Sequence, residues 1–227
     1  EWDATIGRKL ETMESVYAGS WDGRFYAMLV QVRADAVLGK ITPQTPEFTL
    51  YHVWHKTHFT KGIPGGRVHL AEDQLYYGAD DGKVYSVNRD SNMLEPYLLQ
   101  GNPFTDLTLT DFNCYVGSRD FIVYALDRLT LRPKWTYPMG CPATYRIYAD
   151  AQQDGKNAYV YIPTETEGLH AILVTKGEKD PTGGSAESGA FVWKMAGVAG
   201  VVSASQDVVY VGLDREKDFP AYGRIKA

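Results

Sequence analysis

A short motif recurs along this chain, and this repetition constrains the fold more than any other feature of the sequence. In three copies a glycine is followed by an aspartate three residues later and by a tyrosine seven residues later. These copies start at Gly19, Gly78 and Gly117 and reach Tyr26, Tyr85 and Tyr124. Such repetition indicates that one supersecondary unit is copied along the chain, and that neighbouring copies stack to bury a shared core.

The spacing of the motif indicates the size of the repeated unit. Another copy is Val209-Tyr210-Val211-Gly212, and we expect a degenerate copy at Tyr159-Val160-Tyr161, with Tyr161 in place of the glycine. The anchor positions 19, 78, 117, 161 and 212 are separated by 59, 39, 44 and 51 residues. Most of these intervals are close to the roughly 40–50 residues of a four-stranded propeller blade.

An aromatic residue precedes each anchor by 17 to 26 residues. The five aromatics are Trp2, Trp54, Tyr97, Trp135 and Trp193. Alternation around the repeated tyrosines marks strands, and Asp-Gly pairs supply the residues of tight hairpins. A glycine inside a strand indicates that another part of the chain approaches closely. Each large aromatic ring can then fill the space between two adjacent sheets.

We therefore predict an all-β chain that forms a β-propeller of about five four-stranded blades. The approximate repeats are 1–28, 29–90, 91–130, 131–176 and 177–227, within a single domain over residues 1–227. Two arrangements of the ends fit this pattern. Either the N-terminal strand with Trp2 completes the last blade and closes a five-bladed ring, or the chain is an incomplete part of a larger propeller.

The repeat resembles that of the PQQ-like, or quinoprotein alcohol dehydrogenase-like, β-propellers. The resemblance rests on the pattern aromatic-Val-Gly-x-x-Asp-Gly-x-φ-Tyr with Trp ending the unit, and it is strongest over residues 73–140. That family includes quinoprotein dehydrogenases, a bacterial outer-membrane assembly lipoprotein and luminal stress-sensor domains. WD40 blades fit less well, because their Gly-His and terminal Trp-Asp pairs do not recur here. The resemblance implies a periplasmic, extracellular or luminal location.

Charge and hydropathy argue against two other classes of protein. The chain has 23 Lys and Arg against 28 Asp and Glu, a net charge of −5, and no basic run. A nucleic acid is therefore not the expected partner. No stretch reaches the roughly 18 apolar residues of a membrane span, so we expect no transmembrane segment.

The acidic residues of the repeat give little support to catalysis. Quinoprotein dehydrogenases hold PQQ over a calcium ion and use an aspartate as general base. Here Asp22, Asp81 and Asp120 stand in the hairpin turns, where aspartate is favoured for its conformation. The sequence therefore predicts no catalytic residue, no cofactor-binding residue and no cofactor, although it does not decide whether the chain is an enzyme.

Histidines cluster in one part of the sequence. His52, His55, His58 and His69 are the candidate ligands for a transition metal. Because side chains alternate along a strand, only His52 and His58 would share a face. Exposed polar strand residues are the competing interpretation.

Two cysteines, Cys114 and Cys141, allow at most one disulfide. Such a bond requires their Cα atoms to lie within about 7 Å of each other. The alternative is a pair of buried free thiols.

These features together predict a non-catalytic propeller that binds protein partners or acts as a scaffold in a larger assembly, outside the cytoplasm. One alternative is a fragment of a PQQ-dependent dehydrogenase, which would need bound PQQ and Ca²⁺. Another is a luminal or periplasmic sensor domain that oligomerises through unpaired sheet edges at residues 1–4 and 221–227.

Overall fold

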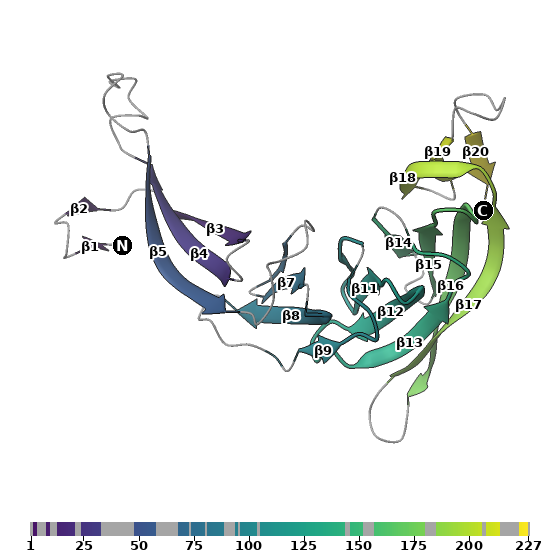
Figure 1. Ribbon diagram of the computed structural model, residues 1–227, viewed down its shortest axis with the longest axis horizontal. Coiled ribbons are helices and arrows are strands. Elements are labelled where there is room, and N and C mark those ends of the chain that lie inside the picture. Colours follow the sequence, from purple (N-terminus) through teal and green to yellow (C-terminus); the bar gives the residue numbers. More distant parts are fainter. Residues whose placement is uncertain are drawn as a thin grey trace. The chain divides into compact units, whose positions relative to one another are not determined.

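Strands form all the regular secondary structure of the described residues in the computed structural model (Figure 1). The chain divides into two compact units, Glu1–Ile63 and Pro64–Ala227. Within the described part of the chain, no helix is long and apolar enough to cross a membrane. The described residues are 2–3, 8–9, 13–20, 24–32, 48–57, 68–72, 74–79, 81–88, 94, 96–103, 105–143, 146–151, 157–179, 185–205, 208–213 and 223–226.

The first unit contains a two-stranded and a three-stranded antiparallel sheet. Its strands are β1 (Trp2–Asp3), β2 (Arg8–Lys9), β3 (Met13–Gly19), β4 (Arg24–Val32) and β5 (Phe48–Thr57). We call the sheet β3–β4–β5 the first sheet. In it Gly19 lies opposite Phe25 and Trp54 lies opposite Ala27. Phe25 and Ala27 are buried, so the motif tyrosine strand carries the core of this sheet.

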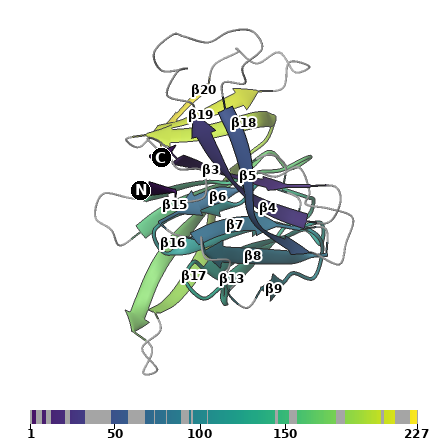
Figure 2. The same ribbon diagram turned by 90° about the vertical axis from the view of Figure 1, so that its left-hand side faces the viewer.

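The second unit contains four antiparallel sheets, each with its strands in chain order (Figures 1 and 2). The second sheet is β6 (His69–Ala71), β7 (Gln74–Gly78), β8 (Lys83–Asn88) and β9 (Tyr97–Leu98). The third is β10 (Thr108–Leu109), β11 (Asn113–Gly117), β12 (Ile122–Asp127) and β13 (Pro133–Pro138). The fourth is β14 (Tyr148–Ala151), β15 (Asn157–Pro163), β16 (Leu169–Lys179) and β17 (Ser185–Met195). The fifth is β18 (Val198–Ser205), β19 (Val208–Leu213) and β20 (Gly223–Lys226).

A turn of five residues joins the second and third strands of the second, third and fourth sheets, with its left-handed residue at the fourth position in the second and third sheets and at the fifth position in the fourth. It is closed by backbone hydrogen bonds from Ala79 N to Lys83 O at 3.0 Å, from Ser118 N to Ile122 O at 3.0 Å, and from Thr164 N to Gly168 O at 2.8 Å. Positive φ angles occur at Gly82 (80°), Phe121 (64°) and Gly168 (85°). The Asp-Gly turn expected from the sequence is thus present at Asp81-Gly82, and in the third sheet a phenylalanine takes the left-handed position.

The fourth sheet corrects our alignment of the degenerate copy. In the first three sheets the motif glycine pairs with the residue six positions later, as Gly78 with Val84 and Gly117 with Val123. In the fourth sheet the equivalent pair is Pro163 with Leu169. Pro163 therefore takes the place of the glycine, two residues after Tyr161. The aromatic pattern around Tyr161 misled the alignment because the turn that follows it has no Asp-Gly pair.

Two motif glycines, Gly78 on β7 and Gly117 on β11, lie where the chain segment that leads to the next sheet packs against their strand. A Cβ at Gly78 would lie 2.9 Å from Cβ of Pro103, and a Cβ at Gly117 would lie 2.9 Å from Cβ of Ala143. Pro103 and Ala143 in turn form isolated β-bridges with Ser118 and Thr164 of the next sheet. Each connection is thus held between two successive sheets, and it leaves no room for a side chain on the glycine.

Aromatic residues of the fourth strands pack against the following sheet. The ring of Tyr97 lies 6.1 Å from that of Tyr124. Trp135 is only 9% exposed and belongs to a core cluster with Ile172 of the fourth sheet. A Cβ at Gly189 on β17 would lie 3.0 Å from the Trp135 ring. The core of the second unit therefore lies between consecutive sheets, as expected for stacked blades.

The strands at the two ends of the chain pair locally. Trp2 of β1 lies opposite Lys9 of β2. Ile225 of β20 lies opposite Val209 of β19. The described strand pairs thus do not include one between Trp2 and the last sheet, which a closed five-bladed ring would require. The number of blades stays a prediction.

Candidate interaction surface

The turn between β12 and β13 is organised by the carboxylate of Asp127. Its Oδ1 accepts hydrogen bonds from Leu129 N at 3.0 Å and from Thr130 N and Oγ1, both at 2.9 Å. Leu131 is buried in the core cluster between the second and third sheets, with a φ of 54°. The turn is therefore fixed by the hydrogen bonds to Asp127 and by the burial of Leu131. The side chain of Leu129, between them, is 64% exposed to solvent.

The neighbouring turn, between β10 and β11, is equally well defined. Thr110 N donates to the carbonyl of Asn113 at 2.9 Å, and Asn113 N donates to Thr110 Oγ1 at 3.1 Å. Asn113 Nδ2 also donates to the hydroxyl of Tyr115 at 2.7 Å. The residue at the tip is Phe112, whose side chain is 55% exposed.

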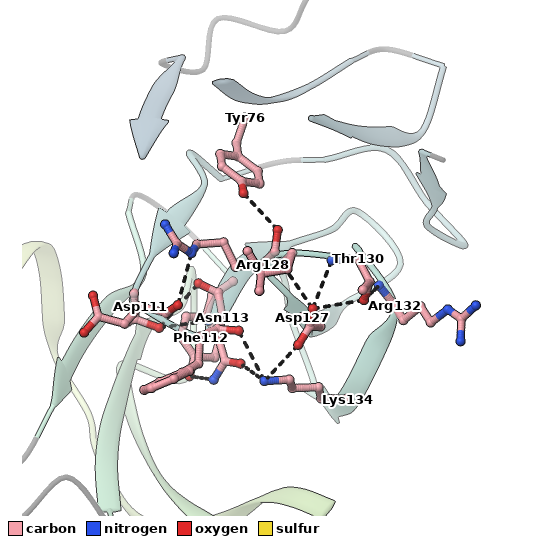
Figure 3. A network of polar contacts seen from close by, with 12 residues as sticks. Tyr76, Asp111, Phe112, Asn113, Asp127, Arg128, Thr130, Arg132 and Lys134 are labelled. Carbon is pink, nitrogen blue, oxygen red and sulfur yellow. Dashed lines mark hydrogen bonds and ion pairs between the residues drawn. The ribbon is translucent and has the colours of Figure 1, made fainter. Parts of the chain in front are cut away.

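Arg128 and Lys134 join the two turns (Figure 3). Arg128 N donates to the carbonyl of Phe112 at 3.0 Å, and Arg128 Nε donates to the carbonyl of Asp111 at 3.1 Å. Lys134 Nζ donates to the Phe112 carbonyl at 3.2 Å and to Asn113 Oδ1 at 2.8 Å. Phe112 and Leu129 are thus held on adjacent, mutually bonded turns.

The same arginine connects this end of the third sheet to the second sheet. The hydroxyl of Tyr76, on β7, donates to the carbonyl of Arg128 at 2.9 Å. The guanidinium lies 3.3 Å from the carboxylate of Glu72, in the turn between β6 and β7. Figure 3 shows the Tyr76 ring pointing toward Arg128 in the turn of the third sheet. A buried hydroxyl with a carbonyl partner avoids the cost of an unsatisfied polar group, so this contact fixes one sheet against the other.

The electrostatics of the surface are balanced internally. Asp127 lies 3.4 Å from the ammonium of Lys134. Burial alone would raise the pKa of Asp127, but the hydrogen bonds from Thr130 and the charge of Lys134 outweigh it and hold this pKa below the usual 3.8. Asp127 thus pairs with Lys134, and Arg128 pairs with Glu72, while the apolar side chains of Phe112 and Leu129 face solvent.

Replacing Asp127 by asparagine tests this arrangement. We expect the free energy of unfolding near neutral pH to fall by about 1 kcal/mol, because one charged acceptor of three turn hydrogen bonds is lost. A depressed folded pKa stabilises the fold above the unfolded value and loses that effect as pH falls through the folded value. Urea unfolding at neutral pH and at about pH 3 measures this, and the difference between wild type and Asp127→Asn should shrink in acid. An equal difference at both pH values would contradict the assigned role.

Most of the candidate metal ligands lie in a part of the chain where side chains are not described. His52 and His55 lie on β5, opposite Met28 and Tyr26 in register, and His58 lies outside the described residues. His69 lies on β6, in the other unit. Among the residues with described side chains, no group of three or more His, Cys, Asp or Glu is placed to hold a metal ion. The metal site stays a prediction.

The two cysteines are free and buried, and no disulfide joins them. Burial raises the pKa of Cys114, on β11, to about 12. Cys141 follows β13, and burial alone would raise its pKa too. Hydrogen bonds with Thr166, Thr164 and the backbone of Glu167 outweigh that effect and lower it. The two thiols thus differ in acidity.

The residues predicted as structural repeat positions lie on strands. Gly78 and Gly117 end β7 and β11, the second strands of their sheets. Gly19 ends β3, which is the first described strand of its sheet, and Gly212 lies on β19. Trp54, Tyr97, Trp135 and Trp193 lie on β5, β9, β13 and β17, the last strands of the first four sheets. Trp2 lies on β1. Each of these four aromatics therefore lies on the last strand of a sheet. It belongs to the same sheet as the preceding motif copy, whereas the sequence spacing had assigned it to the copy that follows.

Sequence reasoning missed this candidate surface. Phe112, Arg128 and Leu129 lie in turns that carry no copy of the repeated motif, and Lys134 lies at the start of β13. One local signal was available, since Asp127 with Thr130 three residues later is typical of a turn capped by aspartate. The pairing of this turn with that of Phe112 depends on the sheet register, which the sequence alone does not give.

These sheets, with their strands in chain order and their cores between neighbours, define a β-propeller-type fold. No protein-family model and no curated protein matches the chain. In structure it is similar to the computationally designed protein Ika8, with a TM-score of 0.57 and 13% identity over 88% of this chain and 52% of that one. It is also similar to the propeller BamB from Moraxella catarrhalis, with a TM-score of 0.51 and 12% identity over 93% of this chain and 71% of that one. The chain spans about half the length of Ika8, and at these identities the likeness extends to the fold.

Proposed function

We propose that this chain is a non-catalytic, PQQ-like β-propeller module that binds a protein partner outside the cytoplasm. The observation that carries the proposal is the pair of exposed apolar side chains, Phe112 and Leu129, on two turns that are bonded to each other. Exposed apolar residues that lie close together often mark binding sites, and aromatic residues are favoured there. The PQQ-like repeat and the extracytoplasmic location rest on the resemblance of the sequence motif.

The surroundings of this pair favour a protein over a small ligand. Many of the polar atoms of the two turns already accept or donate within the network around Asp127, Arg128 and Lys134. What the end of the blade offers to a partner is therefore apolar area on a rigid support. Preorganised apolar anchors are typical of the residues that dominate protein–protein affinity. The dehydrogenase and oligomerising-sensor alternatives stay predictions from the sequence.

The double variant Phe112→Ser/Leu129→Ser tests the proposal. Wild type and variant would be compared in quantitative cross-linking and affinity recovery from extracts of the source cells. We expect at least one specific partner to be recovered with wild type and to fall about tenfold with the variant, since anchor residues contribute roughly 1–2 kcal/mol or more each. Far-UV circular dichroism would show that the variant keeps its strands, because neither side chain lies in the core.

The matched control uses exposed apolar residues at the other end of the third sheet and of the neighbouring second sheet. Leu98 and Phe121 are also exposed, and Phe121 lies in the turn at the other end of β11 from Phe112. The variant Leu98→Ser/Phe121→Ser should recover the same partner as wild type. A partner that is lost equally with both double variants, or with neither, would contradict binding through the Phe112 end.

A further inference from the structure

Two exposed carboxylates share the surface that carries Phe112 and Leu129. The side chain of Glu72, in the turn between β6 and β7, is 77% exposed. Asp111 precedes Phe112 in the turn between β10 and β11, and it is exposed as well. Figure 3 shows the carboxylate of Asp111 pointing away from the hydrogen bonds that hold the turn. The apolar pair is thus accompanied by two negatively charged groups.

Arg128 links the two turns that carry these carboxylates. Its Nη2 lies 3.3 Å from Oε1 of Glu72, and its Nε donates to the backbone carbonyl of Asp111 at 3.1 Å. The guanidinium is therefore shared between the turns, and the Arg128 side chain is only 11% exposed. Because Asp111 uses its carbonyl, its carboxylate takes no part in this contact. Arg128 thus holds Glu72 close to the turn of Asp111 and Phe112.

The basic groups of this surface are either turned inward or lie on its other side. Lys134 Nζ lies 3.4 Å from Oδ2 of Asp127, and the lysine side chain is only 16% exposed. Arg132 is exposed, but Figure 3 shows it extending to the side away from Asp111. Among the described residues, the exposed charges beside Phe112 are therefore acidic.

The other end of the third sheet has a different charge beside its exposed aromatic. Phe121, in the turn between β11 and β12, is 44% exposed, and Arg119 in the same hairpin is exposed too. Asp120 is half-buried, and its carboxylate accepts hydrogen bonds from the Ile122 amide and the Tyr124 hydroxyl. One exposed phenylalanine of this sheet is therefore accompanied by carboxylates, and the other by an arginine.

We propose that the partner of the Phe112 end is a basic, apolar protein segment, an inference that rests on the proposed function. In the complex an arginine or lysine of the partner lies over the ring of Phe112 and pairs with Glu72 and Asp111. An apolar side chain of the same segment covers Leu129. A cation is attracted to the face of an aromatic ring, and nearby carboxylates add to that attraction. Complementary charges of this kind speed association and suppress wrong partners.

The charge preference of the surface can be measured by NMR of the full chain without a partner. Two nitroxide probes, one with an ammonium group and one with a carboxylate, are added in turn, and the relaxation enhancements of the Phe112 and Phe121 signals are compared. We expect the ratio of cationic to anionic enhancement to be several-fold higher at Phe112 than at Phe121 in about 0.1 M salt, and this difference to shrink in about 1 M salt. Equal ratios at the two phenylalanines overturn the proposal, whether or not a partner has been recovered.

The double variant Glu72→Gln/Asp111→Asn removes both charges and keeps the turns. Glutamine retains an oxygen that accepts from Arg128, and Asp111 bonds to Arg128 through its backbone carbonyl. In the extract experiment we expect recovery of the partner to fall several-fold with this variant, and to fall likewise for wild type in about 1 M salt. Arg132→Gln is the matched control and should recover at least as much partner as wild type.

The outcomes separate this inference from the proposed function. A partner that is lost with Phe112→Ser/Leu129→Ser but recovered fully with Glu72→Gln/Asp111→Asn overturns the basic segment and leaves the proposed function intact. A partner that is recovered equally with both double variants contradicts the proposed function, and the inference falls with it. A loss with both double variants, together with full recovery by Arg132→Gln, is the result that the basic segment predicts.

Discussion

Replacing Trp135 by alanine is expected to lower the free energy of unfolding of the second unit by about 3–5 kcal/mol. The ring of Trp135 lies 5.8 Å from that of Tyr115 in its own sheet and belongs to the core cluster with Ile172 of the next sheet. Its removal would open a cavity between two sheets, where Gly189 offers no side chain to fill it. Urea unfolding followed by far-UV circular dichroism measures the loss.

The control for this variant lies on the same strand. Thr136 is exposed on β13, so Thr136→Ala should change the free energy of unfolding by no more than about 0.5 kcal/mol. A loss for Trp135→Ala that is as small as that of Thr136→Ala would mean that the ring does not join the third and fourth sheets.

Replacing Gly117 by valine is the second large expected effect. A Cβ at this position would lie 2.9 Å both from Cβ of Ala143 and from Cγ2 of Thr105, and both neighbours are buried. The added methyl groups would push the connection away from β11 and strain the hydrogen bond from Gly117 N to Thr105 Oγ1. We expect a loss of about 1–3 kcal/mol, the usual cost of overpacking, measured by the midpoint of urea unfolding.

Gly197 supplies the comparison for this effect. No atom lies within 4 Å of a Cβ built at Gly197, and its φ of 74° is a conformation that asparagine tolerates. Gly197→Asn should therefore cost only a few tenths of a kcal/mol. If Gly117→Val and Gly197→Asn cost the same, close approach of the connection is not the reason for the glycine.

The all-β fold could be predicted from the sequence because the repeated glycines, aspartates and tyrosines are also the residues that make the turns and the contacts between sheets. Gly78 and Gly117 are required by the approach of Pro103 and Ala143, so the repeat records contacts between sheets as well as turns. The turn aspartates and the tyrosines that bond to them lie four residues apart, and this spacing is visible without coordinates. The described sheets confirm the all-β organisation, and the second, third and fourth sheets have the four strands expected of a blade.

Other features depend on register and could not be predicted. The position of Pro163 in the repeat follows from its pairing with Leu169, whereas the sequence pattern favoured Tyr161. Phe112 and Leu129 lie on neighbouring turns because the two turns are bonded to each other, and neither turn carries the repeated motif.

The central claim is that the successive sheets of the second unit stack as blades, with an aromatic residue of the last strand of one sheet packed against the next. Nuclear Overhauser effects from the Trp135 ring in the full chain test it most directly. Strong signals to the Gly189 α-protons and to the Ile172 methyl groups are predicted, since the ring lies against both residues. Signals confined to the third sheet, such as those to Tyr115 alone, would contradict the stacking and with it the propeller-type fold.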